Sequence, residues 1–219
     1  MSQYDYKPEY QRNLPHIQPP GAMLFVTFRL AGSIPVEVLR QLKADAAARE
    51  KQILQIEDPE EQAAQLYRER KRQFGRWDDV LDSGVYGPDW LRRPEIAAIV
   101  AEAMHHRDGK VYDLDSFCIM PTHGHTIFTP LVKDDGSYHA LQTIMHSLKL
   151  RTALQSNPLL GREGPFWQHE SYDHVVRDQR ELERIRWYLL NNPVKAGLVE
   201  TWEAWPWTYW KAHHASPKL

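Results

Sequence analysis

Two strand-like segments joined by a very short connection constrain the fold of this chain more than any other feature. Residues 110–119 and 122–129 both read as strands, with Pro121 between them. Neighbouring parallel strands need a crossover of about a dozen residues or more, whereas antiparallel strands can be joined by a tight turn. The sequence therefore favours an antiparallel sheet over a doubly wound parallel one.

The rest of the sequence alternates between strand and helix patterns. Residues 22–32 predict another strand, because apolar side chains recur at every second position from Leu24 to Leu30. A short strand is predicted over 172–177, and helices are predicted over 36–56, 59–74, 94–107, 138–155 and 178–192. Few strands among several helices predict an α+β fold, in which helices pack on the sheet. We expect one domain over residues 1–219, with a helical insertion after the first strand at about 33–93.

The last long helix has clear start and stop signals. Asp178 and Glu181 form a capping-box pattern at its start. Pro193 and Gly197 predict its end, because proline lacks a backbone N–H and glycine readily adopts the left-handed conformation that closes helices. This helix is therefore predicted over 178–192.

Charge and composition limit the classes of function. Lysine and arginine together number 27 against 29 acidic residues, a formal net charge of −2, so any nucleic-acid binding needs a local patch rather than bulk charge. One basic cluster, which we interpret as a solvated helix face, comprises Arg68, Arg70, Lys71, Arg72 and Arg76. The single cysteine, Cys118, excludes an internal disulfide and favours a reducing cytoplasm. No apolar run approaches the ~20 residues that span a bilayer.

The segment "MPTHGHTIF", residues 120–128, carries two histidines one residue apart. In a strand His123 and His125 point to the same side, where they could ligate one divalent cation if a third group joins them. They could equally be a catalytic base with its neighbour, or two polar positions on a solvent-exposed face. Because the chain has 11 histidines, the pair alone favours the polar interpretation.

A tyrosine and an asparagine in the last long helix form a second candidate pair. Tyr188 and Asn192 are four residues apart and therefore share one helical face. Considered alone, Tyr188 fits an amphipathic residue at the rim of the core. Asn192, directly before Pro193, fits a helix terminus.

Taken together, these segments resemble a known family. "FVTFRL", "MPTHGHTIF", "FWQHESYDHVVRD" and "YLLNNPVKAGLV" occur in this order in the chain, and in that order they resemble the REP-associated tyrosine transposases, a group of single-tyrosine HUH transposases. The resemblance covers nearly the whole chain. It says least about residues 36–74.

The resemblance implies a ferredoxin-like antiparallel sheet and a metal-dependent enzyme that nicks and rejoins single-stranded, hairpin-bearing DNA. By position, Tyr188 matches the nucleophile that forms a covalent 5′-phosphotyrosine intermediate. His123, His125 and Asn192 match the residues that hold the metal, Mg²⁺ or Mn²⁺. Arg177, Arg184, Arg186 and His174 lie near these segments in the sequence and are candidate DNA contacts.

Two positions depart from the family pattern. The residue between the histidines is usually bulky and apolar in the family, but here it is Gly124, which we expect to leave the opposite face of the strand unpacked. Thr122 stands where relatives often have asparagine. Both departures put rate and metal affinity in doubt more than the class of reaction.

Two other functions remain open at this point. The chain could be a non-catalytic descendant that binds the same DNA, or a metal-dependent hydrolase whose nucleophile is water. We rank the tyrosine-based enzyme first, because His123, His125, Tyr188 and Asn192 are all present. Related HUH transposases often act as dimers, but no obvious dimerisation helix is present, so we expect a monomer in the cytoplasm.

Overall fold

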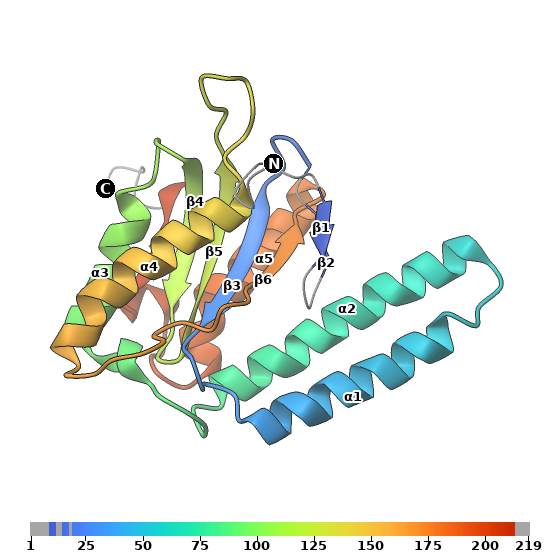
Figure 1. Cartoon of the computed structure of the whole chain (residues 1–219), viewed down its shortest axis with the longest axis horizontal. Helices are drawn as coiled ribbons and strands as arrows, with labels where there is room; N and C mark the ends of the chain where they lie inside the picture. Colours follow the sequence, from blue (N-terminus) through green and yellow to red (C-terminus); the bar gives the residue numbers. More distant parts are fainter. Residues whose placement is uncertain (1–8, 12–14, 18, 213–219) are drawn as a thin grey trace.

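A five-stranded antiparallel sheet forms the centre of the molecule (Figure 1). The computed structural model describes residues 9–11, 15–17 and 19–212. The strand order is β6–β3–β5–β4–β7. The strands are β3 (Leu24–Arg29), β4 (Tyr112–Ile119), β5 (His123–Pro130), β6 (Tyr172–Val175) and β7 (Thr208–Trp210), and β1 (Glu9–Gln11) pairs separately with β2 (Pro15–Ile17). The antiparallel pair expected from the short connection is β4 with β5, which confirms the prediction.

The helices fall between the strands in an order that defines the fold. They are α1 (Val36–Ile53), α2 (Pro59–Asp82), α3 (Pro94–His105), α4 (Leu141–Leu159) and α5 (Gln179–Lys195), with short 3₁₀ turns at Trp90–Arg92 and Trp202–Ala204. Along the chain, β3–α3–β4–β5–α4–β6 is a βαββαβ unit, and its strands lie in the order β6–β3–β5–β4. This is the ferredoxin-like arrangement, so the predicted α+β fold class is confirmed. Within the described part of the chain, no helix is long and apolar enough to cross a membrane.

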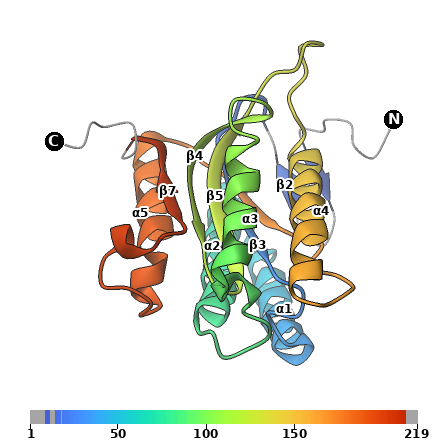
Figure 2. The same ribbon diagram turned by 90° about the vertical axis from the view of Figure 1, so that its left-hand side faces the viewer.

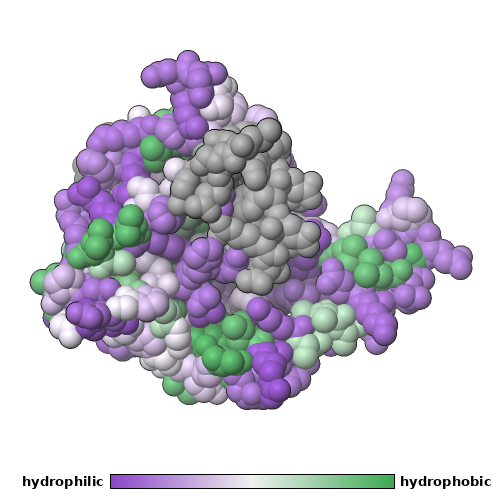
Figure 3. All heavy atoms as spheres, viewed as in Figure 1, coloured by the Kyte–Doolittle hydropathy of each residue, from purple (hydrophilic) through white to green (hydrophobic). Residues whose placement is uncertain are grey.

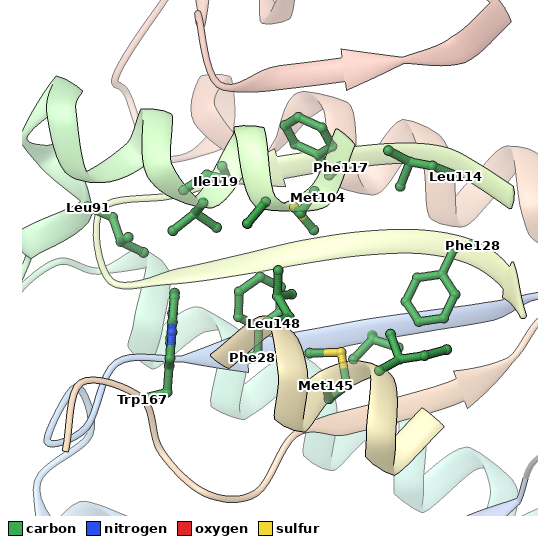
Figure 4. Packing of buried hydrophobic residues seen from close by; sticks show 14 of the residues in the cluster. Phe28, Leu91, Met104, Leu114, Phe117, Ile119, Phe128, Met145, Leu148 and Trp167 are labelled. Carbon is green, nitrogen blue, oxygen red and sulfur yellow. The ribbon is translucent and has the colours of Figure 1, made fainter. Parts of the chain in front are cut away.

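Helices cover both faces of the sheet (Figure 2). Helices α3 and α4 lie on one face, over a core that includes Phe28, Phe128 and Leu148 (Figure 4). Helix α5 lies on the other face and packs Leu189 against a second apolar cluster that contains Phe25. Every residue of β3 is buried, including the polar residues Thr27 and Arg29, because helices cover both faces of the sheet.

Helices α1 and α2 form a helical arm, residues 36–82, that projects from the sheet (Figure 1). The face seen in Figure 3 mixes hydrophilic and hydrophobic residues along the arm. Helix α2 was predicted to end at residue 74, but it continues through Gly75 to Asp82. A glycine inside a helix is unfavourable by only ~1 kcal/mol, and burial of Asp78 and Leu81 against the rest of the molecule holds the last two turns in place.

The end of α5 also differs from the prediction. The helix passes through Pro193 and ends at Lys195, because a proline in the last turn removes only one helical hydrogen bond. Gly197 then closes it with φ of 67°. The Gly197 N–H donates to the Val194 carbonyl and the Leu198 N–H donates to the Pro193 carbonyl, both over 2.9 Å. Asn192 therefore lies inside the helix rather than at its terminus.

Gly124 does not leave the opposite face of β5 unpacked, so that expectation was wrong. Phe28 lies directly across from Gly124 in the β3–β5 register. A Cβ atom at position 124 would lie 2.7 Å from Cζ of Phe28. The Phe28 ring thus occupies the space that a side chain at position 124 would need, and it packs edge-on against Trp167 at 5.0 Å between centroids.

Replacing Gly124 with alanine is expected to lower the free energy of unfolding by about 1–3 kcal/mol, because the new methyl group overlaps the Phe28 ring. Urea denaturation followed by circular dichroism measures this change. In a Phe28→Leu background the same alanine is expected to be less unfavourable, since the ring is gone. An equal loss of stability in both backgrounds would contradict this explanation.

Candidate active site

His123 and His125 lie on the central strand β5 and point toward α5. Both side chains are 0% exposed, which rules out the interpretation that they are polar positions on a solvent-exposed face. Their Nε2 atoms are 2.9 Å apart. Two ring nitrogens therefore converge on one buried spot, as the alternation of side chains along a strand predicts.

Two threonine hydroxyls hold the outer nitrogens of these rings. The Thr122 hydroxyl donates to the Leu81 carbonyl at 3.2 Å and lies 2.9 Å from Nδ1 of His123, so it accepts the Nδ1 proton. Thr27 Oγ1 lies 2.8 Å from Nδ1 of His125. With Nδ1 carrying the proton, each Nε2 keeps a lone pair for a metal ion. Thr122, a departure from the family pattern, is thus a residue that orients His123.

The surroundings keep both imidazoles neutral. Burial lowers the pKa of His123 to about 3, with a smaller contribution from the positive charge of Lys195. Burial also lowers the pKa of His125 well below its usual value, as do His123 and Lys195. Neutral imidazole is the form that ligates metals, so the pair is ready to bind one near neutral pH.

Helix α5 brings Tyr188 and Asn192 to the same spot. The side-chain amide nitrogen of Asn192 lies 2.7 Å from Nε2 of His125, and Asn192 is 1% exposed. An amide can present either its nitrogen or its oxygen by rotation, and the oxygen is a metal ligand. The Tyr188 ring lies 5.8 Å from the His125 ring, between centroids, and edge-on to Phe25 at 6.4 Å.

The hydroxyl of Tyr188 is the most distinctive group at this site. It is buried and has no hydrogen-bond partner among the described residues. An unpaired buried hydroxyl is unfavourable unless a ligand or substrate completes it. This arrangement leaves the hydroxyl available to a reacting group beside the histidine pair.

Two acidic residues of α2 complete the site, and the sequence analysis missed both. Asp78 Oδ1 lies 3.5 Å from Nε2 of His125, and Asp82 Oδ1 lies 3.6 Å from Nε2 of His123. Burial raises the pKa of Asp78, and burial raises that of Asp82 to about 6 although Lys195 opposes it. The signal that could have found them is the helical repeat of Phe74, Asp78 and Asp82 at four-residue spacing, which continues α2 beyond Gly75.

The residues present therefore fit a divalent cation. Asp78, His123 and His125 offer one ligand atom each within 4.8 Å of one another, all of them buried. Two imidazoles with a carboxylate, and an amide beside them, suit several divalent metals, including Mn²⁺. A cavity of about 150 Å³ lies beside His123 and is lined by residues that include Asp82 and Thr122.

Three of the four candidate DNA contacts lie together, around the buried carboxylate of Glu181. Oε1 of Glu181 accepts hydrogen bonds from Lys71 at 2.8 Å and from Arg184 at 2.9 Å, and lies 3.2 Å from Nε2 of His174. The Arg177 backbone N–H donates to Oε2 at 3.1 Å. We call this group the Glu181 cluster. Lys71 is therefore tied to α5, rather than being part of a purely solvated helix face.

The Glu181 cluster borders a cavity of about 170 Å³ lined by Tyr67, Arg177, Asp178, Arg180, Glu181 and Arg184. The guanidinium carbon of Arg177 lies 3.6 Å from the centroid of the Tyr67 ring. Cationic and aromatic side chains thus line one open hollow between α2 and the start of α5. This is the combination that single-strand nucleic-acid binders use.

Arg186 does not join this cluster. Its guanidinium donates two hydrogen bonds to Asp115 of β4, at 2.6 and 3.0 Å. Both side chains are largely buried. Arg186 follows Arg184 by two residues, which places it about 200° around the helix and away from the cavity.

Comparison with known proteins finds a similar protein among those that have been curated. No family model matches the sequence. A curated protein of Haemophilus influenzae, named as a REP-associated tyrosine transposase, is 28% identical over 102 residues, which are 44% of this chain and 58% of that protein. The chain resembles the REP-associated tyrosine transposases. The match spans little more than half the length of this relative.

A solved structure of a protein with the same family name is similar to this chain at lower sequence identity. It is a REP-associated tyrosine transposase bound to a REP hairpin, and it aligns with 91% of this chain and 81% of its own. The sequence identity is 16% and the TM-score is 0.47.

Glu181 is expected to stabilise the fold through its charge. Burial alone would raise its pKa, but hydrogen bonds from Lys71 and Tyr67 outweigh burial and lower the pKa to about 2. The unfolded value is about 4.3, so the stabilisation is fully present above that pH and is lost as pH falls toward 2. Glu181→Gln is therefore expected to lower the free energy of unfolding by about 2 kcal/mol at pH 7 and by much less near pH 3.

Denaturant titrations at the two pH values measure this difference. Glu183→Gln is the matched control, because Glu183 is exposed on the same helix. A loss of stability in Glu181→Gln that is equal at pH 7 and pH 3 would show that the charge of Glu181 contributes nothing.

Proposed function

We propose that this protein nicks and rejoins single-stranded DNA through a metal-dependent reaction of Tyr188. The observation that carries the proposal is the buried, unpaired Tyr188 hydroxyl beside two inward-facing neutral histidines. A tyrosine nucleophile next to a metal-binding pair is an arrangement suited to phosphoryl transfer. Similarity to a REP-associated tyrosine transposase supports the same reaction.

In this proposal His123 and His125 hold the divalent metal, Mg²⁺ or Mn²⁺, and the Asn192 amide joins them. The metal, when bound, neutralises charge on the non-bridging oxygens of the scissile phosphate. Thr27 and Thr122 keep both ring nitrogens directed inward. The site is buried, so its electrostatic interactions are stronger than they would be in water.

Tyr188 supplies the nucleophile. Its hydroxyl oxygen forms a bond to phosphorus while the bond from phosphorus to the 3′ oxygen breaks, and the phenolic proton is transferred, overall, to the departing 3′ oxygen. The products are a 5′-phosphotyrosine and a free 3′-hydroxyl. Attack by a 3′-hydroxyl reverses these steps and rejoins the strands. The covalent bond stores the energy of the cleaved linkage, so the reaction needs no nucleotide cofactor.

The Glu181 cluster is the proposed contact for the DNA backbone. Arg177 and Arg184 border the cavity beside it, and His174 lies behind them against Glu181. Arg186 is expected to contribute less, because Asp115 already holds its guanidinium. A hairpin-bearing substrate is proposed from the family resemblance. We propose a monomer that works in the cytoplasm, where its DNA substrate lies.

Covalent trapping tests the reaction. Incubation with a labelled single-stranded hairpin and Mn²⁺ is expected to give a slower-migrating adduct on a denaturing gel. Tyr188→Phe and EDTA are each expected to abolish it. Tyr209→Phe is the matched control, because Tyr209 packs on the opposite face of the sheet.

Other results would point to other functions. Tight hairpin binding without any adduct would support a non-catalytic DNA-binding descendant of such a transposase. Cleavage that persists in Tyr188→Phe, with no adduct, would support a metal-dependent hydrolase that uses water.

Salt dependence tests the DNA contacts. A double change of Arg177→Gln and Arg184→Gln is expected to weaken binding of a single strand. It is also expected to flatten the slope of log affinity against log salt by roughly 0.7 for each phosphate that the protein no longer neutralises. Fluorescence anisotropy at several salt concentrations measures both. Arg186→Gln is expected to leave the slope nearly unchanged, and an unchanged slope in the double variant would exclude the cluster as a DNA contact.

A further inference from the structure

The proposed function does not yet explain the buried carboxylate of Asp78, which lies beside the histidine pair. Asp78 is 1% exposed, and neither of its oxygens has a hydrogen-bond partner among the described residues. The nearby Asn192 amide lowers the pKa of Asp78, but the amide is uncharged and does not neutralise the carboxylate. Buried carboxylates are usually paired or bound to a metal, so this one lacks a cation.

The geometry around Asp78 shows where that cation belongs. Its Oδ1 lies 3.5 Å from Nε2 of His125 and 3.8 Å from Nε2 of His123, and the two nitrogens are 2.9 Å apart. A triangle with these sides has its centre about 2.0 Å from each corner, which is close to the bond length of Zn²⁺ to nitrogen or Mg²⁺ to oxygen. One ion can therefore contact all three atoms with little movement of the side chains.

We propose that Asp78 of the helical arm is a further protein ligand of the divalent metal, in addition to His123, His125 and Asn192. The inference rests on the proposed metal-dependent function and adds a residue that lies outside the sheet and outside α5. The amide of Asn192 lies 2.7 Å from Nε2 of His125, and Asp82 Oδ1 lies 3.6 Å from Nε2 of His123. A carboxylate with two imidazoles is a donor set that Mn²⁺ accepts readily.

The ligand couples metal binding to the position of α2. Besides Asp78, Lys195 of α5 links the two helices through Asp79 at 2.7 Å and Asp82 at 3.2 Å, and Phe74 lies 6.1 Å from the Tyr188 ring, between centroids. Since a bound ion would join Asp78 to the histidines of β5, metal binding stabilises the position in which the helical arm lies against the sheet and α5 (the docked arm). By reciprocity, a docked arm tightens metal binding.

The test measures Mn²⁺ affinity by isothermal titration calorimetry, without DNA. Asp78→Asn is expected to weaken binding at least about tenfold, since removal of even an outer partner of a metal ligand weakens affinity 10- to 100-fold. It is also expected to lose the rise in Tm that Mn²⁺ gives the wild type. Glu60→Gln is the matched control, because Glu60 is an exposed acidic residue at the other end of the same helix. Without metal, Asp78→Asn is expected to be at least as stable as the wild type, since it replaces a buried carboxyl group that has no cationic partner with a neutral amide of similar size.

The outcomes separate this inference from the proposed function. Wild-type Mn²⁺ affinity in Asp78→Asn, with binding lost in His123→Ala, would overturn the role of Asp78 and leave the metal-dependent reaction intact. Absence of Mn²⁺ binding in the wild type would overturn both. Hydrogen exchange of residues 74–82 gives a second readout: Mn²⁺ is expected to slow exchange there in the wild type and not in Asp78→Asn. Equal slowing in both proteins would contradict the coupling.

Discussion

The 2.9 Å approach of two imidazole nitrogens on β5 is the constraint on which the rest of the site depends. Strand alternation places both rings on the face that α5 covers, and burial keeps both neutral. On the other face of β5, the residue between the two histidines is Gly124, which has no side chain to fill the core. Phe28 does so by lying against Gly124, so the core under α3 and α4 is shaped by the same three residues as the site above α5.

Groups from four segments of the chain, β3, β5, α5 and α2, meet at this site. The sheet supplies the histidines and Thr27, α5 supplies Tyr188 and Asn192, and α2 supplies Asp78. The sheet and α5 share an apolar cluster, so their side chains are held by packing on rigid elements. Helix α2 is held against α5 by side-chain contacts, several of which are ion pairs.

The parts of this structure that local patterns determine could be predicted from the sequence. The β4–β5 pair, the start of α5 and the shared face of Tyr188 and Asn192 follow from periodicity and capping residues. The prediction missed Asp78 because it ended α2 near Gly75, and because only long-range packing decides which helix covers β5. Arg186 shows the same limit: it is close to Tyr188 in sequence, but Asp115 of β4 holds it elsewhere.

The burial of the site has a consequence for how a substrate could enter. The Tyr188 hydroxyl and both histidines have no exposed surface, so a DNA strand cannot contact them while α2 stays in this position. Entry therefore requires α2 to move away from the site. Several of the contacts that hold α2 against α5 are ion pairs, including Lys71 with Glu181 and Asp79 with Lys195. Phosphates compete for the same cations that hold α2. Under the proposed function, binding of the DNA strand and displacement of α2 are therefore coupled, because both involve the same lysine and arginine side chains.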